Sequence, residues 1–300
     1  MYDETLIEVA AEADEQLRAK LSAEVPFMAQ SVERWLDEVF GGAGLAEVFT
    51  RIDAFPMLLI PWWADGSIGE RNRQLHRRLT YSTMNGYLYI RLIDNLMDGD
   101  APADVDLLPA LSFFQLEFVE PYRRLFPPAH RFWSDFRSIW LEAAEVTMQD
   151  GALTEVDRTA FSRISSRKTG AAKIPVAAVC HYHGRLHHQP RWNGLVEALG
   201  RWHQMHNDIF GWRKDVSHDR ATFFLSEGLR RRPDTDLEGW FIEEGFSWGM
   251  EELGRAMVNL KRIATNLDAR DLHAYLDARD LEVRSRADQI ERDLEAVLGS

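Results

Sequence analysis

Apolar residues recur three and four positions apart along almost the whole chain. In the segment 4–38 they fall, for example, at Leu6, Val9, Ala13 and Leu17, which is the spacing of amphipathic helices. No stretch alternates convincingly with the period of two that a half-buried strand requires, and no internal repeat appears. Further helical runs are predicted over about 70–98, 130–149, 154–189 and 192–216, and in charged segments from 234 to 298. The sequence therefore predicts an all-α fold in a single domain spanning 1–300.

Composition excludes several classes of function. The formal net charge of −13 argues against a nucleic-acid partner, because phosphate binding needs strongly clustered positive charge. The one cysteine, Cys180, excludes an internal disulfide and fits a reducing compartment. The N-terminus is acidic and lacks the apolar core of a signal peptide, and no window approaches the ~18 apolar residues of a membrane span. We expect a soluble, cytoplasmic protein without a membrane span.

The stretch Arg91–Asp100, RLIDNLMDGD, places two carboxylates inside an apolar helical run. Asp94 and Asp98 are four residues apart, so on a helix they project from one face. Burial and mutual repulsion both disfavour the ionised carboxylates, and a hard cation such as Mg²⁺ compensates for both effects. The alternative is a solvated helix end capped by Gly99, with both acids facing water.

A second polar run, WHQMHNDIFGWRKD at Trp202–Asp215, follows later in the chain. Asn207, Gly211 and Asp215 recur every four residues, which places them on one face of a continuous helix. Asp208 lies beside this face and Gln204 lies one turn before it. A glycine inside a helix costs about 1 kcal/mol relative to alanine, so Gly211 indicates close approach of a ligand or of another helix. A helix–helix contact with a wet polar rim remains the alternative.

Basic residues lie between and after the two acidic runs. Each of them alone is typical of a solvated surface charge. Together with carboxylates that gather Mg²⁺, they are typical of a diphosphate clamp, in which cations neutralise a departing phosphate group. The candidates are Arg163, Arg167, Lys168, Lys214 and Arg220.

At this point the motifs resemble those of the class I isoprenoid synthases. LIDNLMDGD is similar to the DDxxD segment of trans-prenyl diphosphate synthases, with Asp94 and Asp98 at its ends and Asn95 in place of the second aspartate. Lys168-Thr169 resembles the Lys-Thr pair that lies between the two metal motifs of that family. Arg220-Ala-Thr222 is similar to the family's later Lys-x-Thr element.

The second motif resembles two branches of this superfamily. Gln204, Asn207 and Asp208 are in register with the second aspartate-rich motif of the prenyl diphosphate synthases. Asn207, Asp208, Lys214 and Asp215 match the NDxxSxxKE pattern of the terpene cyclases, with Gly211 in place of serine. The matched parts span about residues 80–225, and their order and separation are more specific than any one motif.

Departures from the family pattern decide the favoured subclass. Chain-elongating synthases have an arginine pair after DDxxD and a basic segment near the N-terminus, which help to hold the two diphosphates. Here Asp98 is followed by GDAPADVDLL without an arginine, and in the N-terminal region Arg51 in RIDAFP is a poor match to a basic cluster. We therefore expect a terpene synthase that ionises and cyclises one allylic diphosphate of fifteen or twenty carbons. The arginine–tyrosine pair that terpene cyclases carry near the C-terminus is not evident either.

The resemblance implies a helical bundle with a central apolar cavity and three Mg²⁺ ions bound with the substrate diphosphate. Tyr89 and Phe114 are expected in the substrate pocket, where aromatic faces stabilise an allylic cation. The resemblance also allows a homodimer. The expected catalytic residues are Asp94, Asp98, Asn207, Asp215 and Arg220. The expected metal ligands are Asp94, Asp98, Asn207, Asp208 and Asp215. The expected substrate-binding residues are Arg163, Arg167, Lys168, Gln204, Lys214, Arg220, Tyr89 and Phe114.

Three alternatives stay open. The first is a prenyltransferase that elongates a chain or joins two isoprenoid units head to head. The second is a non-catalytic helical protein that keeps the fold and binds an isoprenoid or a protein partner. The third, a di-iron carboxylate bundle, is disfavoured because no Glu-x-x-His pair occurs near Asp94 or Asn207.

Overall fold

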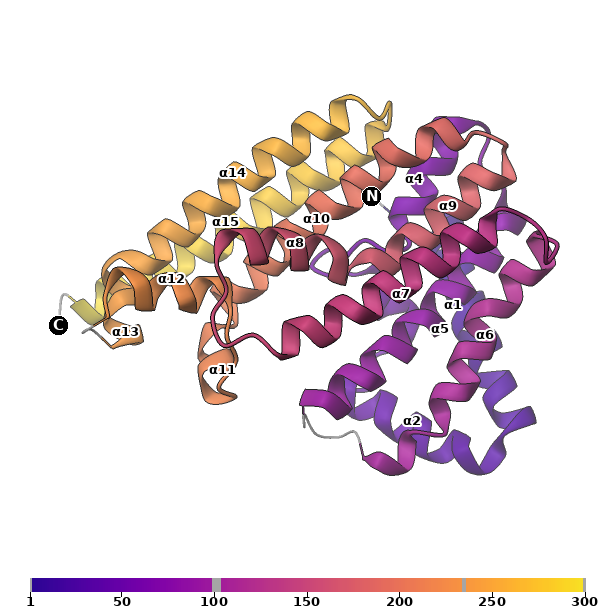
Figure 1. Ribbon diagram of the computed structural model, residues 1–300, viewed down its shortest axis with the longest axis horizontal. Helices are drawn as coiled ribbons and strands as arrows, with labels where there is room; N and C mark the ends of the chain where they lie inside the picture. The colour runs from indigo at the N-terminus through magenta and orange to yellow at the C-terminus, as the bar shows by residue number, and fades with distance from the viewer. Residues whose placement is uncertain (1, 99–103, 234–235, 299–300) are drawn as a thin grey trace. The chain divides into compact units, whose positions relative to one another are not determined.

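The computed structural model is built from helices and describes residues 2–98, 104–233 and 236–298 (Figure 1). Within these ranges it contains no strand, so the predicted all-α class is confirmed. By internal contacts the helices form two compact units. Unit 1 comprises Met1–Phe136 and Pro175–His188, and unit 2 comprises Arg137–Ile174 and Gln189–Ser300. That the chain is one domain over 1–300 stays a prediction.

Unit 1 is organised around one long helix. Helix α5, Arg73–Asp98, packs against α1, Glu4–Glu24, and against α6, Ala110–Leu125. The side chain of Asp3 caps α1 by accepting a hydrogen bond from the backbone N–H of Leu6. The other helices of the unit are α2, Pro26–Phe40; α3, Leu45–Thr50; α4, Leu59–Ile68; the short 3-10 turn Val105–Leu107; and the first part of α7, Phe132–Gly151.

A buried carboxylate ties three parts of unit 1 together. Asp65 on α4 is fully buried, and its oxygens accept hydrogen bonds from Nε2 of His76 on α5 and Nε2 of His183, at 2.8 and 2.5 Å. The backbone N–H of Asn72 donates a third hydrogen bond, at 3.0 Å. Burial would raise the pKa of Asp65, but these hydrogen bonds outweigh it and hold the pKa below its ordinary value.

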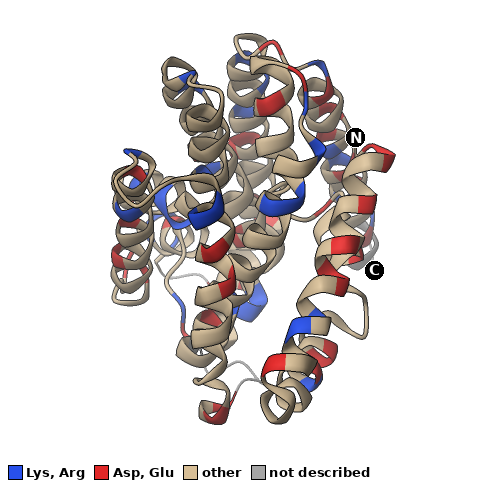
Figure 2. Ribbon diagram, turned by 90° about the vertical axis from the view of Figure 1, so that its right-hand side faces the viewer, with Lys and Arg blue, Asp and Glu red and all other residues tan. Residues whose placement is uncertain are grey.

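Unit 2 is arranged around α10, Gln189–Phe210, which contacts α8, Arg158–Lys168; α12, Phe223–Arg231; and α14, Phe246–Thr265. Packing is tight at Gly200, where a Cβ atom would lie 2.3 Å from Thr169 Oγ1 and 2.6 Å from the carbonyl oxygen of Ser165. The remaining elements are α11, Trp212–Ser217; α13, Leu237–Trp240; a π-helical turn, Phe241–Gly245; and α15, Arg270–Leu298, which packs on α14. Lysine and arginine are dispersed over many helices rather than gathered on one (Figure 2).

Two of the predicted helical runs are not continuous helices in the structure. The run over 154–189 is divided into α8, a 3-10 turn at Gly170–Ala172, α9 at Lys173–Tyr182 and a second turn at Leu186–His188. Gly184, with φ of 64°, turns the chain after α9. The run over 192–216 is interrupted at Gly211, between α10 and α11. The long helix predicted over about 70–98 is present as α5.

Candidate functional site

The first acidic motif occupies the last turns of α5. Asp94 is half-buried, and its charge acts on the nearby Tyr87 of the same helix. Asn95 is only 3% exposed, and its Oδ1 has no hydrogen-bond partner in the part of the chain that the structure describes. Asp98 is the last residue of α5, and its side chain lies outside the described residues.

The second motif lies on α10 in unit 2. Gln204 Nε2 donates a hydrogen bond of 2.7 Å to Oδ1 of Asp208, one helical turn later. Asp208 is 2% exposed, whereas its neighbour Asn207 is exposed. The Oδ1 atom of Asn207 lies 3.3 Å from Nδ1 of His206. Asp208 is therefore the buried carboxylate of this motif, and Gln204 fixes its orientation.

Burial raises the pKa of Asp208 from its ordinary value of 3.8 to about 7. The hydrogen bond from Gln204 and the charge of Lys168 act in the opposite direction, while Asp215 and Asp150 add to the increase. A carboxylate that is disfavoured in this way gains most from a cation placed beside it. The electrostatics of Asp208 thus suit a metal ligand.

The structure corrects the expected geometry at Gly211. Its φ and ψ are −106° and 0°, which are not helical values. Gly211 is therefore the single residue that separates α10 from α11. The helix expected to carry Asn207, Gly211 and Asp215 is therefore interrupted at Gly211, although the backbone N–H groups of Gly211 and Asp215 still donate to the carbonyl oxygens four residues earlier, at 2.8 and 3.2 Å. A Cβ atom at Gly211 would lie 2.8 Å from the carbonyl oxygen of Asn207, so the close approach inferred from the sequence is to the chain's own backbone.

Asp215 is half-buried on α11, and burial raises its pKa. The positive charges of Arg220, Lys214, His218 and Lys168 act against this increase, in that order of size. In unit 2, therefore, Asp215 lies close enough to Asp208 to raise its pKa. Lys168 acts on both carboxylates, and Lys214 and Arg220 act on Asp215.

The other two candidate cations are engaged elsewhere. Arg167 forms an ion pair with Glu142 of α7 at 3.3 Å, and an NH group of Arg163 donates a hydrogen bond to Gln149 of the same helix. Both arginines are exposed. Neither is among the main causes of the raised pKa of Asp208 or Asp215. Their role in substrate binding stays a prediction.

Asp150 lies close to Lys168 and Asp208, although no sequence motif singles it out. Its Oδ2 accepts a hydrogen bond of 2.8 Å from Nζ of Lys168, and its charge contributes to the raised pKa of Asp208. The only sequence signal was a polar residue before Gly151, near the end of a helix. Asp150 orients Lys168, a role that a motif comparison does not reveal.

The two expected pocket residues of unit 1 lie in or beside its hydrophobic core. Phe114 is fully buried, and its ring centroid lies 6.2 Å from that of Trp35. Tyr89 is half-buried and packs against the same core cluster. Their contact with a substrate stays a prediction.

The donor atoms present fit Mg²⁺. In unit 2 Asp208 and Asp215 offer carboxylate oxygens, which Mg²⁺ prefers, and in unit 1 Asp94 offers the same kind of donor. One or two carboxylates suffice when water and substrate phosphate complete the ion's shell. No group of three or more His, Cys, Asp or Glu side chains placed to hold a metal ion by themselves occurs among the described residues. The set of ligands and the number of ions therefore stay predictions.

Comparison with known proteins supports the fold. No family model and no curated protein matches the chain. Among solved structures the chain is similar to the geranylgeranyl pyrophosphate synthetase from the archaeon Geoglobus acetivorans, with a TM-score of 0.68 and 15% sequence identity over 96% of this chain and 99% of that chain. The chain thus has the all-α isoprenoid-synthase fold that its motifs implied. No helix among the described residues is long and apolar enough to cross a membrane.

Proposed function

We propose that the protein is a Mg²⁺-dependent enzyme that acts on an allylic isoprenyl diphosphate as a prenyltransferase. The observation that carries this proposal is the environment of Asp208, a buried carboxylate with a raised pKa that is held by Gln204 and flanked by Asp215 and Lys168. This arrangement occurs in the fold of a geranylgeranyl pyrophosphate synthetase.

Each residue has a role that follows from its chemistry. Gln204 holds the carboxylate of Asp208 in one orientation, and Asp150 holds the ammonium group of Lys168. Lys168, Lys214 and Arg220 bind phosphate oxygens as cations. Bound Mg²⁺ supplies the positive charge that neutralises the departing diphosphate. The proposed metal ligands are Asp94, Asp98, Asn207, Asp208 and Asp215.

The likeness to a geranylgeranyl pyrophosphate synthetase favours the prenyltransferase over the cyclase that the sequence departures favoured. A terpene synthase is the second candidate. It is supported by the absence of arginine in GDAPADVDLL after Asp98 and by Gly211 at the position of a third acid. Both reactions begin with loss of diphosphate from an allylic substrate, so they share the same metal ligands and differ in the second substrate.

Product analysis separates the two candidates. The full chain is incubated with Mg²⁺ and geranyl, farnesyl or geranylgeranyl diphosphate, each with and without isopentenyl diphosphate, and the extracts are analysed by gas chromatography and mass spectrometry after dephosphorylation. We expect a longer prenyl alcohol, formed only when isopentenyl diphosphate is present. A hydrocarbon or cyclic alcohol formed from one allylic substrate would instead establish the cyclase. Absence of Mg²⁺-dependent turnover with every substrate would contradict both and favour a non-catalytic protein.

A further inference from the structure

Unit 2 carries a groove that contains none of the residues assigned to the metal or the diphosphate. Its volume of about 670 Å³ lies within the range of small-molecule binding sites. We call it the cationic groove. Helices α8, α10, α12 and α14 line it with Arg158, Phe161, Ser162, Ala198, Arg201, Met205, Phe223, Glu252, Arg255, Ala256 and Asn259.

The floor of the cationic groove is apolar and well packed. The rings of Phe161 and Phe223 stack with centroids 4.8 Å apart. Phe223 and Met205 are 2% and 3% exposed, while Phe161 is half-buried and so presents part of its ring to the groove. The accessible apolar surface of the groove is therefore supplied by Phe161 and by the half-buried Ala256 of α14, while Phe223 and Met205 are almost fully covered.

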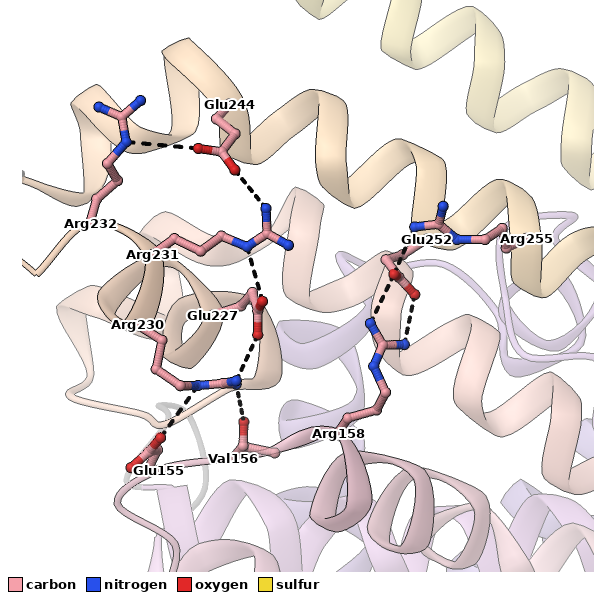
Figure 3. Close-up of polar contacts among 10 residues, drawn as sticks. All are labelled: Glu155, Val156, Arg158, Glu227, Arg230, Arg231, Arg232, Glu244, Glu252 and Arg255. Carbon is pink, nitrogen blue, oxygen red and sulfur yellow. Dashed lines mark hydrogen bonds and ion pairs between the residues drawn. The ribbon is translucent and has the colours of Figure 1, made fainter.

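One wall of the groove is formed by the ion pairs that Arg158 and Arg255 make with Glu252. Arg158 forms two hydrogen bonds with Glu252, of 3.0 and 2.9 Å, and Arg255 donates a third to the same carboxylate, of 2.8 Å (Figure 3). The hydrogen bond from Arg158 is the main reason that the pKa of Glu252 lies below its ordinary value. Arg255 also lies 3.6 Å from Glu251, which is outside the lining. Glu252, the one lining carboxylate, is thus fully engaged by two arginines.

Arg201 adds a further positive charge that these ion pairs do not neutralise. It is half-buried on α10 and, within the described ranges, makes no hydrogen bond or ion pair. It lies seven residues, or about two helical turns, before Asp208 on the same helix. A partly desolvated guanidinium group beside an apolar floor is favourable when an anion pairs with it.

We propose that the cationic groove binds an anionic amphipath, a molecule with a phosphate or carboxylate group on a hydrocarbon chain. The anionic group pairs with Arg201, and the chain lies over Phe161 and Ala256. An inorganic anion would leave the apolar floor uncovered, and a neutral lipid would leave Arg201 unpaired. The overall charge of −13 makes this local excess of cations a specific feature rather than a property of the whole surface.

Calorimetric titration of the full chain tests this proposal in Mg²⁺-free buffer with EDTA. The probes are decyl phosphate and decanoate, which differ in the anionic group, together with decanol and inorganic phosphate, which each lack one half of the ligand. We expect saturable binding of at least one of the two amphipaths, and weaker binding of decanol and of inorganic phosphate. The comparison of decyl phosphate with decanoate identifies the preferred anionic group.

Three variants locate the binding site. Arg201→Ala is expected to weaken amphipath binding by about tenfold or more, because a charge-assisted hydrogen bond is lost. Arg191→Ala, an exposed arginine on α10 outside the groove, is the matched control and should leave binding unchanged. Lys168→Ala should also leave it unchanged. Binding that is lost in Lys168→Ala and kept in Arg201→Ala would place the ligand at the proposed diphosphate site and overturn the proposal. Absence of binding by both amphipaths, or equal binding of inorganic phosphate, would overturn it as well.

Discussion

Gln204 and Asp208 form a hydrogen-bonded pair one turn apart on α10, with Nε2 of the amide 2.7 Å from Oδ1 of the carboxylate. The amide donates to only one of the two carboxylate oxygens. Asp208 is buried and lies near the negative charges of Asp215 and Asp150, which explains why its pKa is raised to about 7. The pair therefore holds a carboxylate in place at a free-energy cost to the protein when no cation is bound.

This cost predicts that Asp208→Asn raises the stability of the protein and lowers its activity. A folded pKa above the unfolded value means that stability falls as the pH rises from about 4 to about 7. The neutral amide removes this loss, so the metal-free variant should be more stable than the wild type at pH 8, by roughly 2–4 kcal/mol. The difference should shrink towards pH 4. Urea unfolding followed by circular dichroism measures it.

The control for this variant is Asp288→Asn, which removes one charge at an exposed position of α15. Its stability should change by less than about 0.5 kcal/mol at either pH. At the same time Asp208→Asn should lose Mg²⁺-dependent turnover. A variant that is destabilised at pH 8, or that keeps full turnover, would contradict the role given to Asp208.

Asp65 is predicted to be a principal stabilising residue of unit 1. Asp65→Asn removes the charge that accepts hydrogen bonds from His76 and His183, and disruption of such a buried pair costs about 3–5 kcal/mol. The folded pKa of Asp65 is lowered, so its contribution is present above the ordinary value of 3.8 and is lost as the pH falls through the folded value. Urea unfolding at pH 7 and below pH 4 should therefore show a large difference that decreases in acid.

The matched control in the same unit is Asp53→Asn, which breaks an exposed ion pair with Arg51. Exposed pairs contribute about 0–1 kcal/mol, so this variant should unfold almost as the wild type does. Equal stabilities of the Asp65 and Asp53 variants would show that the buried cluster does not stabilise the unit.

The contact between α8 and α10 predicts that alanine substitution changes the stability of the protein very differently at two glycines of α10. Gly200→Ala places a methyl group 2.3 Å from Thr169 Oγ1, and overpacking of this kind costs about 1–3 kcal/mol. Gly194→Ala places its methyl group where no atom lies within 4 Å, so it should stabilise the helix by about 0.5–1 kcal/mol. Thermal unfolding of both variants should show shifts of opposite sign. A Gly200 variant as stable as the Gly194 variant would mean that α8 and α10 are not in close contact there.

The sequence predicted the helices better than the contacts between them. Periodicity identified α5 because its apolar face is long and uninterrupted. It missed the break at Gly211, since the residues around a single glycine keep helical spacing while the backbone leaves the helix. A local pattern does not contain the information that decides whether a glycine interrupts a helix or admits a neighbouring one.

The candidate site shows the same limit. Asp208 was identified because a motif of known spacing surrounds it, whereas Asp150 was missed because its relation to Lys168 depends on how α7 packs in unit 2. For Arg163 and Arg167, spacing alone did not show that their partners are Gln149 and Glu142. Charges distant in sequence are paired by tertiary packing, which the order of residues along one helix does not specify.

Release of pyrophosphate from an allylic diphosphate tests the central claim most directly. Pyrophosphate is measured during incubation of the full chain with farnesyl diphosphate and isopentenyl diphosphate, in Mg²⁺ and in EDTA, for the wild type and for the double variant Asp94→Ala, Asp98→Ala. The account predicts release by the wild type only in Mg²⁺. In the double variant the rate should fall by at least about 100-fold, with helix content unchanged, because the metal's stabilisation of the leaving group is lost. Release at the wild-type rate by the double variant, or in EDTA, would contradict the account.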